Sequence, residues 1–212
     1  MRRALGDIPF TTSYHVRAAH AAKYGQDDGV LVAAFEDSQA VGARSGEYAR
    51  AGGWNEYFGE DSSVRRVRTQ ALRAVARYAD GRGEETSLLS AFCSRLNCWP
   101  RGLAYRIYDK HLGYTEGIVL RCASDGDLQA AKILREEAQE LVSMAKAVTE
   151  KLTMPSPRVA VLGWWFESSV FLDVFTSCMQ EQLPNSPVEM CDRPVVEGAA
   201  IMAKAKSSGY GE

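Results

Sequence analysis

The stretch Asp28-Gly29-Val30-Leu31-Val32-Ala33-Ala34-Phe35 places six consecutive apolar residues behind a turn-forming Asp-Gly pair. The apolar run does not alternate with polar residues, which is typical of a strand buried on both faces. A second run of this kind, Arg158-Val159-Ala160-Val161-Leu162-Gly163, leads directly into Trp164, Trp165 and Phe166. Because helical patterns separate the two runs, we expect an α/β fold with a mixed sheet covered by helices.

Shorter signals fill in the elements around these two strands. A strand over 38–44 and a third strand from Tyr48 flank the hairpin turn Arg44-Ser45-Gly46-Glu47. Apolar spacing predicts helices over 12–24, 63–78, 86–96, 105–112, 128–152, 168–182 and 194–206, and a short strand over 187–190. In the longest helix the expected inner stripe is Leu134, Ala138, Leu141, Val142, Ala145 and Val148.

Length and composition fit one globular domain. The chain has 212 residues, 46% hydrophobic and 25% charged, and we expect one domain over 1–206 with a flexible tail over 207–212. A formal net charge of −2 gives no overall attraction to nucleic acid or to an anionic membrane, so neither is an expected partner. No apolar run approaches the ~20 residues that a spanning helix needs, and the start does not read as a secretory signal.

The cysteines indicate a reducing compartment. There are five of them, and none forms a CxxC pair or stands with a histidine cluster. We therefore expect free thiols, no metal site and a cytoplasmic protein. The five positions are Cys93, Cys98, Cys122, Cys178 and Cys191.

Four stretches in this order resemble the second lobe of the BadF/BadG/BcrA/BcrD ATPase family, which includes the N-acetylglucosamine kinases of the sugar kinase–actin superfamily. They are 28–33, which is similar to the strand before the family's Gly-Thr-Gly-Ser turn; 49–54, similar to its Ala-Gly-Gly-Trp-Gly loop; 70–83, similar to its next helix and exit; and 194–200, similar to its Pro-Val-x-Gly-Ala-Ala closing helix. The resemblance implies a single actin-like ATPase (ribonuclease H-like) lobe. It also implies that the first lobe, with its phosphate loop, is missing from this chain.

Several positions depart from the family pattern, and all of them concern ATP chemistry. Tyr14 stands where the resemblance places the catalytic aspartate, and Phe35-Glu36-Asp37 replaces most of the phosphate-facing glycine turn. The family's Gly-Asp-Glu-Gly-Ser reads Gly59-Glu60-Asp61-Ser62-Ser63, and its later glycine pair reads Gly163-Trp164. We therefore expect no kinase activity, since phosphoryl transfer needs a phosphate cradle, metal ligands and a positioned base.

The same positions supply the candidate site. Aromatic rings could wall a pocket where nucleotide and sugar meet in the family, or they could simply plug that cleft. Polar side chains on neighbouring loop ends could act as acid or hydrogen-bond donor, or could serve as caps and turns. The catalytic candidates are Tyr14, Glu36 and Asp61; the substrate-binding candidates are Phe35, Trp54, Asn55, Trp164, Trp165 and Phe166.

Three functional hypotheses follow. The first is a repurposed enzyme without a cofactor, which binds a mostly apolar small molecule and catalyses a cyclisation or isomerisation such as a Diels–Alder closure. The second is a catalytically inactive, pseudokinase-like binding or regulatory protein. The third is a residual amino-sugar kinase relative. Aromatic residues on the side that faces the first lobe in the family also predict a homodimer. They are Phe10, Tyr14, Phe35, Trp54, Tyr57 and Phe58.

Overall fold

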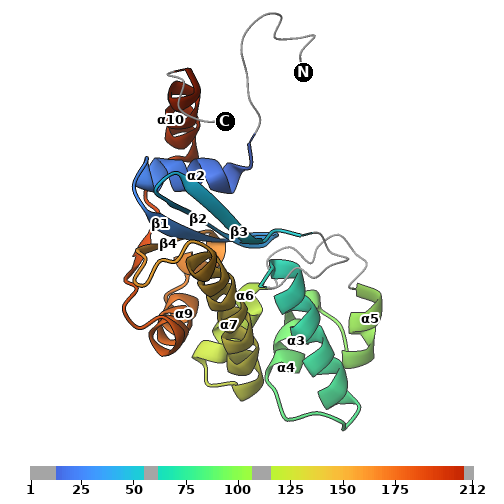
Figure 1. Ribbon diagram of the computed structural model, residues 1–212. Coiled ribbons are helices and arrows are strands. Elements are labelled where there is room, and N and C mark those ends of the chain that lie inside the picture. The colour runs from blue at the N-terminus through green and yellow to red at the C-terminus, as the bar shows by residue number, and fades with distance from the viewer. Residues whose placement is uncertain (1–12, 55–61, 107–115, 208–212) are drawn as a thin grey trace, which may run out of the picture.

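A five-stranded mixed sheet forms the centre of the computed structural model, which describes residues 13–54, 62–106 and 116–207 (Figure 1). The strand order is β3-β2-β1-β4-β5. The central strand β1 (Gly29–Ala34) pairs in parallel with β4 (Val159–Leu162), which pairs in parallel with β5 (Val188–Met190). On its other side β1 runs antiparallel to β2 (Ser38–Arg44), and β2 runs antiparallel to β3 (Glu47–Gly52). The α/β architecture expected from the sequence is confirmed.

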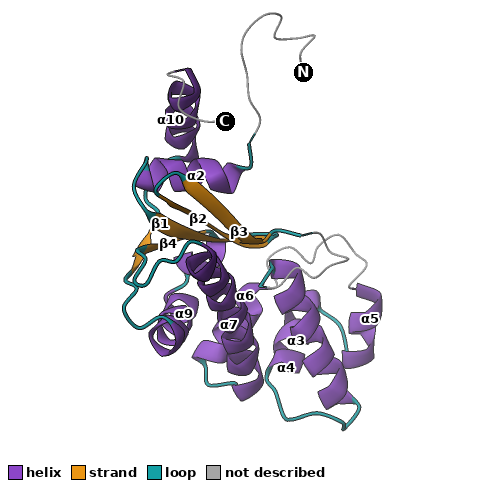
Figure 2. Ribbon diagram, in the orientation of Figure 1, coloured by secondary structure: helices purple, strands orange, loops and turns teal. Residues whose placement is uncertain are grey.

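Every residue of β1 is buried because helices cover both faces of the sheet (Figure 2). On one face, Leu31 and Ala33 pack with Val16 and Ala19 of α2 (His15–Tyr24). On the other face, Val30 and Val32 belong to the main core, which is built largely by α7 (Leu128–Lys151). The stripe expected along the longest helix, from Leu134 to Val148, is buried as predicted.

The remaining described helices complete the two helical layers that cover the sheet. Beside α7 on the main-core side lie α3 (Val64–Ala79), α6 (Glu116–Ser124) and α9 (Ser169–Gln182), and α4 (Leu88–Leu96) packs against α3 and α6. On the opposite side α10 (Val195–Ser207) crosses over α2 (Figure 1). The Asp127 carboxylate caps α7 by accepting a hydrogen bond from the Ala130 N–H at 2.8 Å. None of the helices in the described ranges has the length and apolar composition to span a membrane.

The predicted hairpin is confirmed. Arg44 pairs with Glu47 across a two-residue turn, and both Ser45 (φ 50°) and Gly46 (φ 87°) are left-handed. Two consecutive left-handed residues give the turn that matches the twist of an antiparallel pair.

Some boundaries differ from the predictions. Helix α2 begins at His15 rather than residue 12, and α6 was not predicted at all. Of the helix expected over 105–112, residues 105 and 106 are helical as the end of α5 (Leu103–Arg106), which follows a turn of 3-10 helix, η1 (Pro100–Gly102). Residues 107–112 lie outside the described ranges. A short helix, α8 (Trp164–Glu167), follows β4 where the sequence indicated only a strand exit.

Candidate functional site

The carboxyl ends of the parallel strands β1 and β4 meet at one edge of the sheet, where open α/β sheets place their ligands. Phe35 follows β1 and Trp164 follows β4; their ring centroids lie 6.0 Å apart with the planes at 87°. The centroid of the His15 ring, at the start of α2, lies 5.8 Å from that of Phe35. Three segments distant in sequence therefore present aromatic rings at this edge.

Gly163 makes the approach of Trp164 to Phe35 possible. Its φ of 123° is unfavourable for an L side chain, and a Cβ here would overlap the carbonyl oxygen of Ala34, the last residue of β1. Only glycine lets the exit of β4 pack backbone to backbone against the end of β1. The aromatic pair thus depends on a residue that contributes no side chain.

The turn that follows β1 is closed by its own backbone. The Phe35 N–H donates to the Asp37 carbonyl at 2.9 Å, and the Phe35 carbonyl accepts from the Val64 N–H at the start of α3 at 3.4 Å. The Ser38 hydroxyl donates to the Ser62 carbonyl. Glu36, one of the candidate catalytic residues, stands exposed at the tip of this turn. The turn is therefore rigidly held, with a free carboxylate projecting from it.

Tyr14 lies just before α2, and the residue is 65% exposed. The guanidinium of Arg50 on β3 stacks over its ring, 5.2 Å from the centroid. A cation over the face of a tyrosine restricts the ring and leaves the hydroxyl available at its edge. Tyr14 therefore offers a positioned hydrogen-bonding group beside the sheet.

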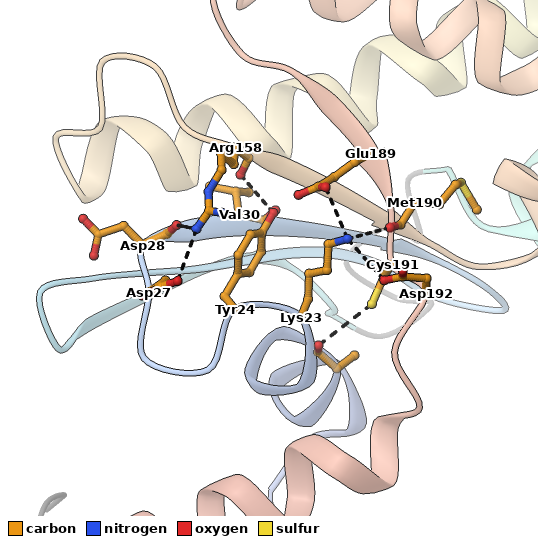
Figure 3. A network of polar contacts seen from close by, with 11 residues as sticks. Lys23, Tyr24, Asp27, Asp28, Val30, Arg158, Glu189, Met190, Cys191 and Asp192 are labelled. Carbon is orange, nitrogen blue, oxygen red and sulfur yellow. Dashed lines mark hydrogen bonds and ion pairs between the residues drawn. The ribbon is translucent and has the colours of Figure 1, made fainter.

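The opposite end of α2 anchors the helix (Figure 3). The Lys23 ammonium contacts the Met190 carbonyl at 2.9 Å and the carboxylates of Glu189 and Asp192 at 3.3 Å each. Burial works against the charge on Lys23, but these two carboxylates outweigh it and raise the pKa of Lys23 above its ordinary value. The Tyr24 hydroxyl contacts the carbonyls of Val30 and Arg158, both at 3.1 Å. Because this end is tied to β1 and β5, the other end is held at the ligand edge.

The loop leaving β3 passes the same edge. Gly52 (φ 74°) and Gly53 (φ 69°) are both left-handed, and the Gly53 N–H donates to the Ser38 carbonyl at 2.9 Å. Trp54 follows, and the residue is 65% exposed. The candidates Asn55 and Asp61 lie outside the described residues.

Trp165 and Phe166 lie elsewhere. Each is 2% exposed and belongs to the main core, where the Trp165 ring packs 5.1 Å from Phe171 and the Phe166 ring 5.1 Å from Phe175. In the helical turn of α8 successive side chains point in different directions, so Trp164 remains at the edge and the next two point inward. Of these three substrate-binding candidates, the structure brings only Trp164 next to Phe35.

Sequence reasoning missed the polar cluster that fixes the start of α3. Ser62 is left-handed (φ 62°), and its N–H donates to the Glu137 carboxylate at 2.7 Å while its hydroxyl donates to the Glu137 carbonyl. The same carboxylate, only 1% exposed, pairs with Arg66 at 3.0 Å. A serine at a position where the family pattern has glycine was the available signal. The cluster sets where the loop before α3 ends.

Neither a metal centre nor a disulfide is found in the described part of the chain. No three His, Cys, Asp or Glu side chains within it gather closely enough to hold an ion. The five cysteines are free thiols. The aromatic edge, with Tyr14 and Glu36 beside it, is thus the candidate site.

One curated relative of this chain is an amino-sugar kinase. The chain is 26% identical over 189 residues to an N-acetylmuramic acid/N-acetylglucosamine kinase of Clostridium acetobutylicum, covering 84% of this chain and 62% of the relative. It therefore spans less than two thirds of that relative's length. This similarity overturns the hypothesis of a cofactor-independent cyclase or isomerase and the expectation that kinase activity is absent, because the matching protein is a kinase.

Solved structures share the fold. A structure from Chromobacterium violaceum, of a protein assigned as an N-acetylglucosamine kinase, superposes with a TM-score of 0.67 at 17% identity, over 90% of this chain and 64% of that one. A ROK family glucokinase of Streptomyces griseus, solved with glucose and AMPPNP, superposes with a TM-score of 0.59 at 14% identity. The match covers 96% of this chain and 70% of the glucokinase. Identities this low establish the actin-like sugar kinase fold alone.

A family model settles the relationship at the level of sequence. It matches residues 3–203, which is nearly the whole chain and includes every segment of the candidate site. The four short resemblances that the sequence analysis identified all lie within this range. The chain belongs to the BadF/BadG/BcrA/BcrD ATPase family.

Proposed function

We propose that the protein binds an N-acetylated amino sugar at the carboxyl edge of β1 and β4 and acts as a kinase-type phosphotransferase on one of its hydroxyls. The observation that carries this proposal is the similarity to an N-acetylmuramic acid/N-acetylglucosamine kinase over 84% of this chain. Since the chain spans 62% of that relative, the activity of the complete relative is not transferred by similarity alone.

The edge suits a sugar ring. Trp164 is 49% exposed and braced edge-on against Phe35, so one face of an indole is held ready for the apolar face of a pyranose. The Tyr14 hydroxyl and the Glu36 carboxylate supply the polar contacts that orient hydroxyl groups. We assign Glu36 as the proton acceptor, because carboxylates are commoner bases than phenols, and Tyr14 as an orienting group.

The nucleotide side of the reaction fits the described residues less well. The Phe35 N–H, which lies in the turn that faces phosphate in the family pattern, is engaged by the Asp37 carbonyl. Phosphoryl transfer uses Mg²⁺ together with the nucleotide, and the described residues form no three-ligand group for it. We therefore derive no step through a metal ion.

The test is transfer of labelled phosphate from ATP to sugar by the purified chain. N-acetylglucosamine and N-acetylmuramic acid are the substrates, and glucose is the comparison. We expect transfer to the N-acetylated sugars that drops at least ~100-fold in Glu36→Gln, which removes the base. Glu84→Gln, an exposed carboxylate in the loop after α3, is the matched control and leaves the rate unchanged.

A sugar-binding regulator is the second candidate, favoured by the self-closed turn at Phe35 and the carboxylate beside it. It predicts that the melting temperature rises with N-acetylglucosamine while no phosphate is transferred. If no phosphate were transferred and no amino sugar raised the melting temperature, both candidate functions would be overturned.

A further inference from the structure

A groove of about 650 Å³ opens between the second half of α3 and the segment formed by η1 and α5. Its floor is apolar, made by Leu72 and Val75 of α3 and by Leu103 of α5. The groove belongs to the helical layer that covers the main-core face of the sheet, whereas the candidate site lies at the strand edge (Figure 1). Its volume falls within the range of small-molecule pockets.

Two aromatic side chains line this groove and point largely into solvent. Trp99 is 71% exposed and Tyr105 is 78% exposed, the two largest exposed fractions among the described aromatic residues. Single exposed apolar residues are ordinary, but two aromatic rings around one apolar groove form a contiguous patch of the kind that marks a binding site. Ring stacking is the contact that such walls offer to a ligand.

The surroundings of the groove are strongly basic. Residues 64–106 contain nine arginines and no lysine against three carboxylates, Asp80, Glu84 and Glu85, which gives this segment a formal charge of +6 in a chain of net charge −2. Arg101 lines the groove, and Arg68 lies one helical turn before Leu72 on the same side of α3. Neither forms an ion pair with a residue in the described ranges.

We propose that this groove binds a small amphipathic anion: a molecule with a planar ring that stacks on Trp99 and a carboxylate, sulfonate or phosphate that pairs with Arg101 and Arg68. The charge argues against a second copy of the chain as the occupant, because two faces of this segment would bring like charges together. The volume fits one such molecule. The site is separate from the proposed sugar site and does not depend on it.

Two fluorescent probes with the same ring system test the proposal: 8-anilinonaphthalene-1-sulfonate, which carries the anion, and neutral N-phenyl-1-naphthylamine, which does not. We expect the sulfonate to bind more tightly to the intact chain. Trp99→Ala is expected to weaken both probes about tenfold through loss of stacking, while Trp99→Phe retains most of the affinity. Arg101→Gln and Arg68→Gln are each expected to weaken only the sulfonate, by about fivefold.

Arg193→Gln is the matched control, since Arg193 is exposed just before α10, which lies on the opposite face of the sheet from the groove. It is expected to leave both affinities unchanged. Equal affinity for the two probes, or a Trp99→Ala variant that binds both as the parent does, would overturn the proposal. A dimer in sedimentation that dissociates on Trp99→Ala would also overturn it, because the groove would then be occupied by another copy of the chain.

Discussion

Ser62 holds a left-handed backbone at a position where the family pattern has glycine, and its hydrogen bonds to Glu137 offset the strain. Ser62→Ala keeps the strain and loses the hydroxyl contact, so it is expected to lower the free energy of unfolding by about 1 kcal/mol. Ser62→Gly loses the same contact, but glycine relieves about 1 kcal/mol of backbone strain, which offsets that loss. Urea denaturation should therefore rank the glycine variant close to the parent and above the alanine variant. The reverse order of the two variants would contradict this account.

His20 provides a pH-dependent contribution to stability. It is buried in α2 with Nε2 2.9 Å from the Gly29 carbonyl, and burial lowers the pKa of His20 below 6.5 despite this hydrogen bond. Below pH 6.5 the unfolded chain binds a proton that the folded chain does not, so the free energy of unfolding decreases as the pH falls from 7 to 5. His20→Gln, which retains a donor, is expected to show a smaller decrease. Parallel curves for the two proteins would rule out this role.

Individual site residues were partly predictable. Phe35 and Trp164 could be placed together because residues that follow adjacent parallel strands emerge at the same edge. Trp165 and Phe166 could not be separated from Trp164, since that requires knowing that the chain enters a helical turn at residue 164. The role of Glu137 depends on a contact 75 residues away along the chain, which no local pattern reveals.

At the scale of elements, the crossing of α10 over α2 depends on Gly198. A Cβ at this position would overlap the Ala18 carbonyl oxygen, so Gly198→Ala must push the helices apart. We expect a loss of about 1–3 kcal/mol in the free energy of unfolding and faster proteolysis near the C-terminus. Gly117→Ala in α6 is the control: its added methyl meets no atom within 4 Å, and stability is expected to stay equal or rise. If both variants were equally stable, the crossing would not be as tight as the structure shows.

Elements with strong periodicity were predicted well, and two short helices, α6 and α8, were not. The stripe of α7 and the apolar run of β1 each reflect a face that must be buried, so pattern and structure agree. Helix α6 (Glu116–Ser124) has a glycine in its first turn, and α8 has only four residues, so neither carries a pattern that marks it as a helix. Their positions are set by packing against α7 and β1, respectively.

For the whole molecule, the mixed sheet and the family could be recognised from sequence, but the function could not. Aromatic and acidic residues at the family's glycine positions suggested a different chemistry, and the similarity to a kinase corrected that interpretation. The homodimer and the single-lobe boundary at residue 206 stay predictions. Sedimentation at micromolar concentration tests the dimer, for which we expect twice the mass of the chain. A single-chain mass at all concentrations would contradict it.

A crystal structure of the chain grown with N-acetylglucosamine and AMPPNP tests the central claim most directly. The account predicts a sugar ring against the exposed face of Trp164, with a hydroxyl within hydrogen-bond distance of Tyr14 or Glu36. A sugar bound elsewhere on the molecule, or an edge that stays empty at a sugar concentration shown to raise the melting temperature, would contradict it.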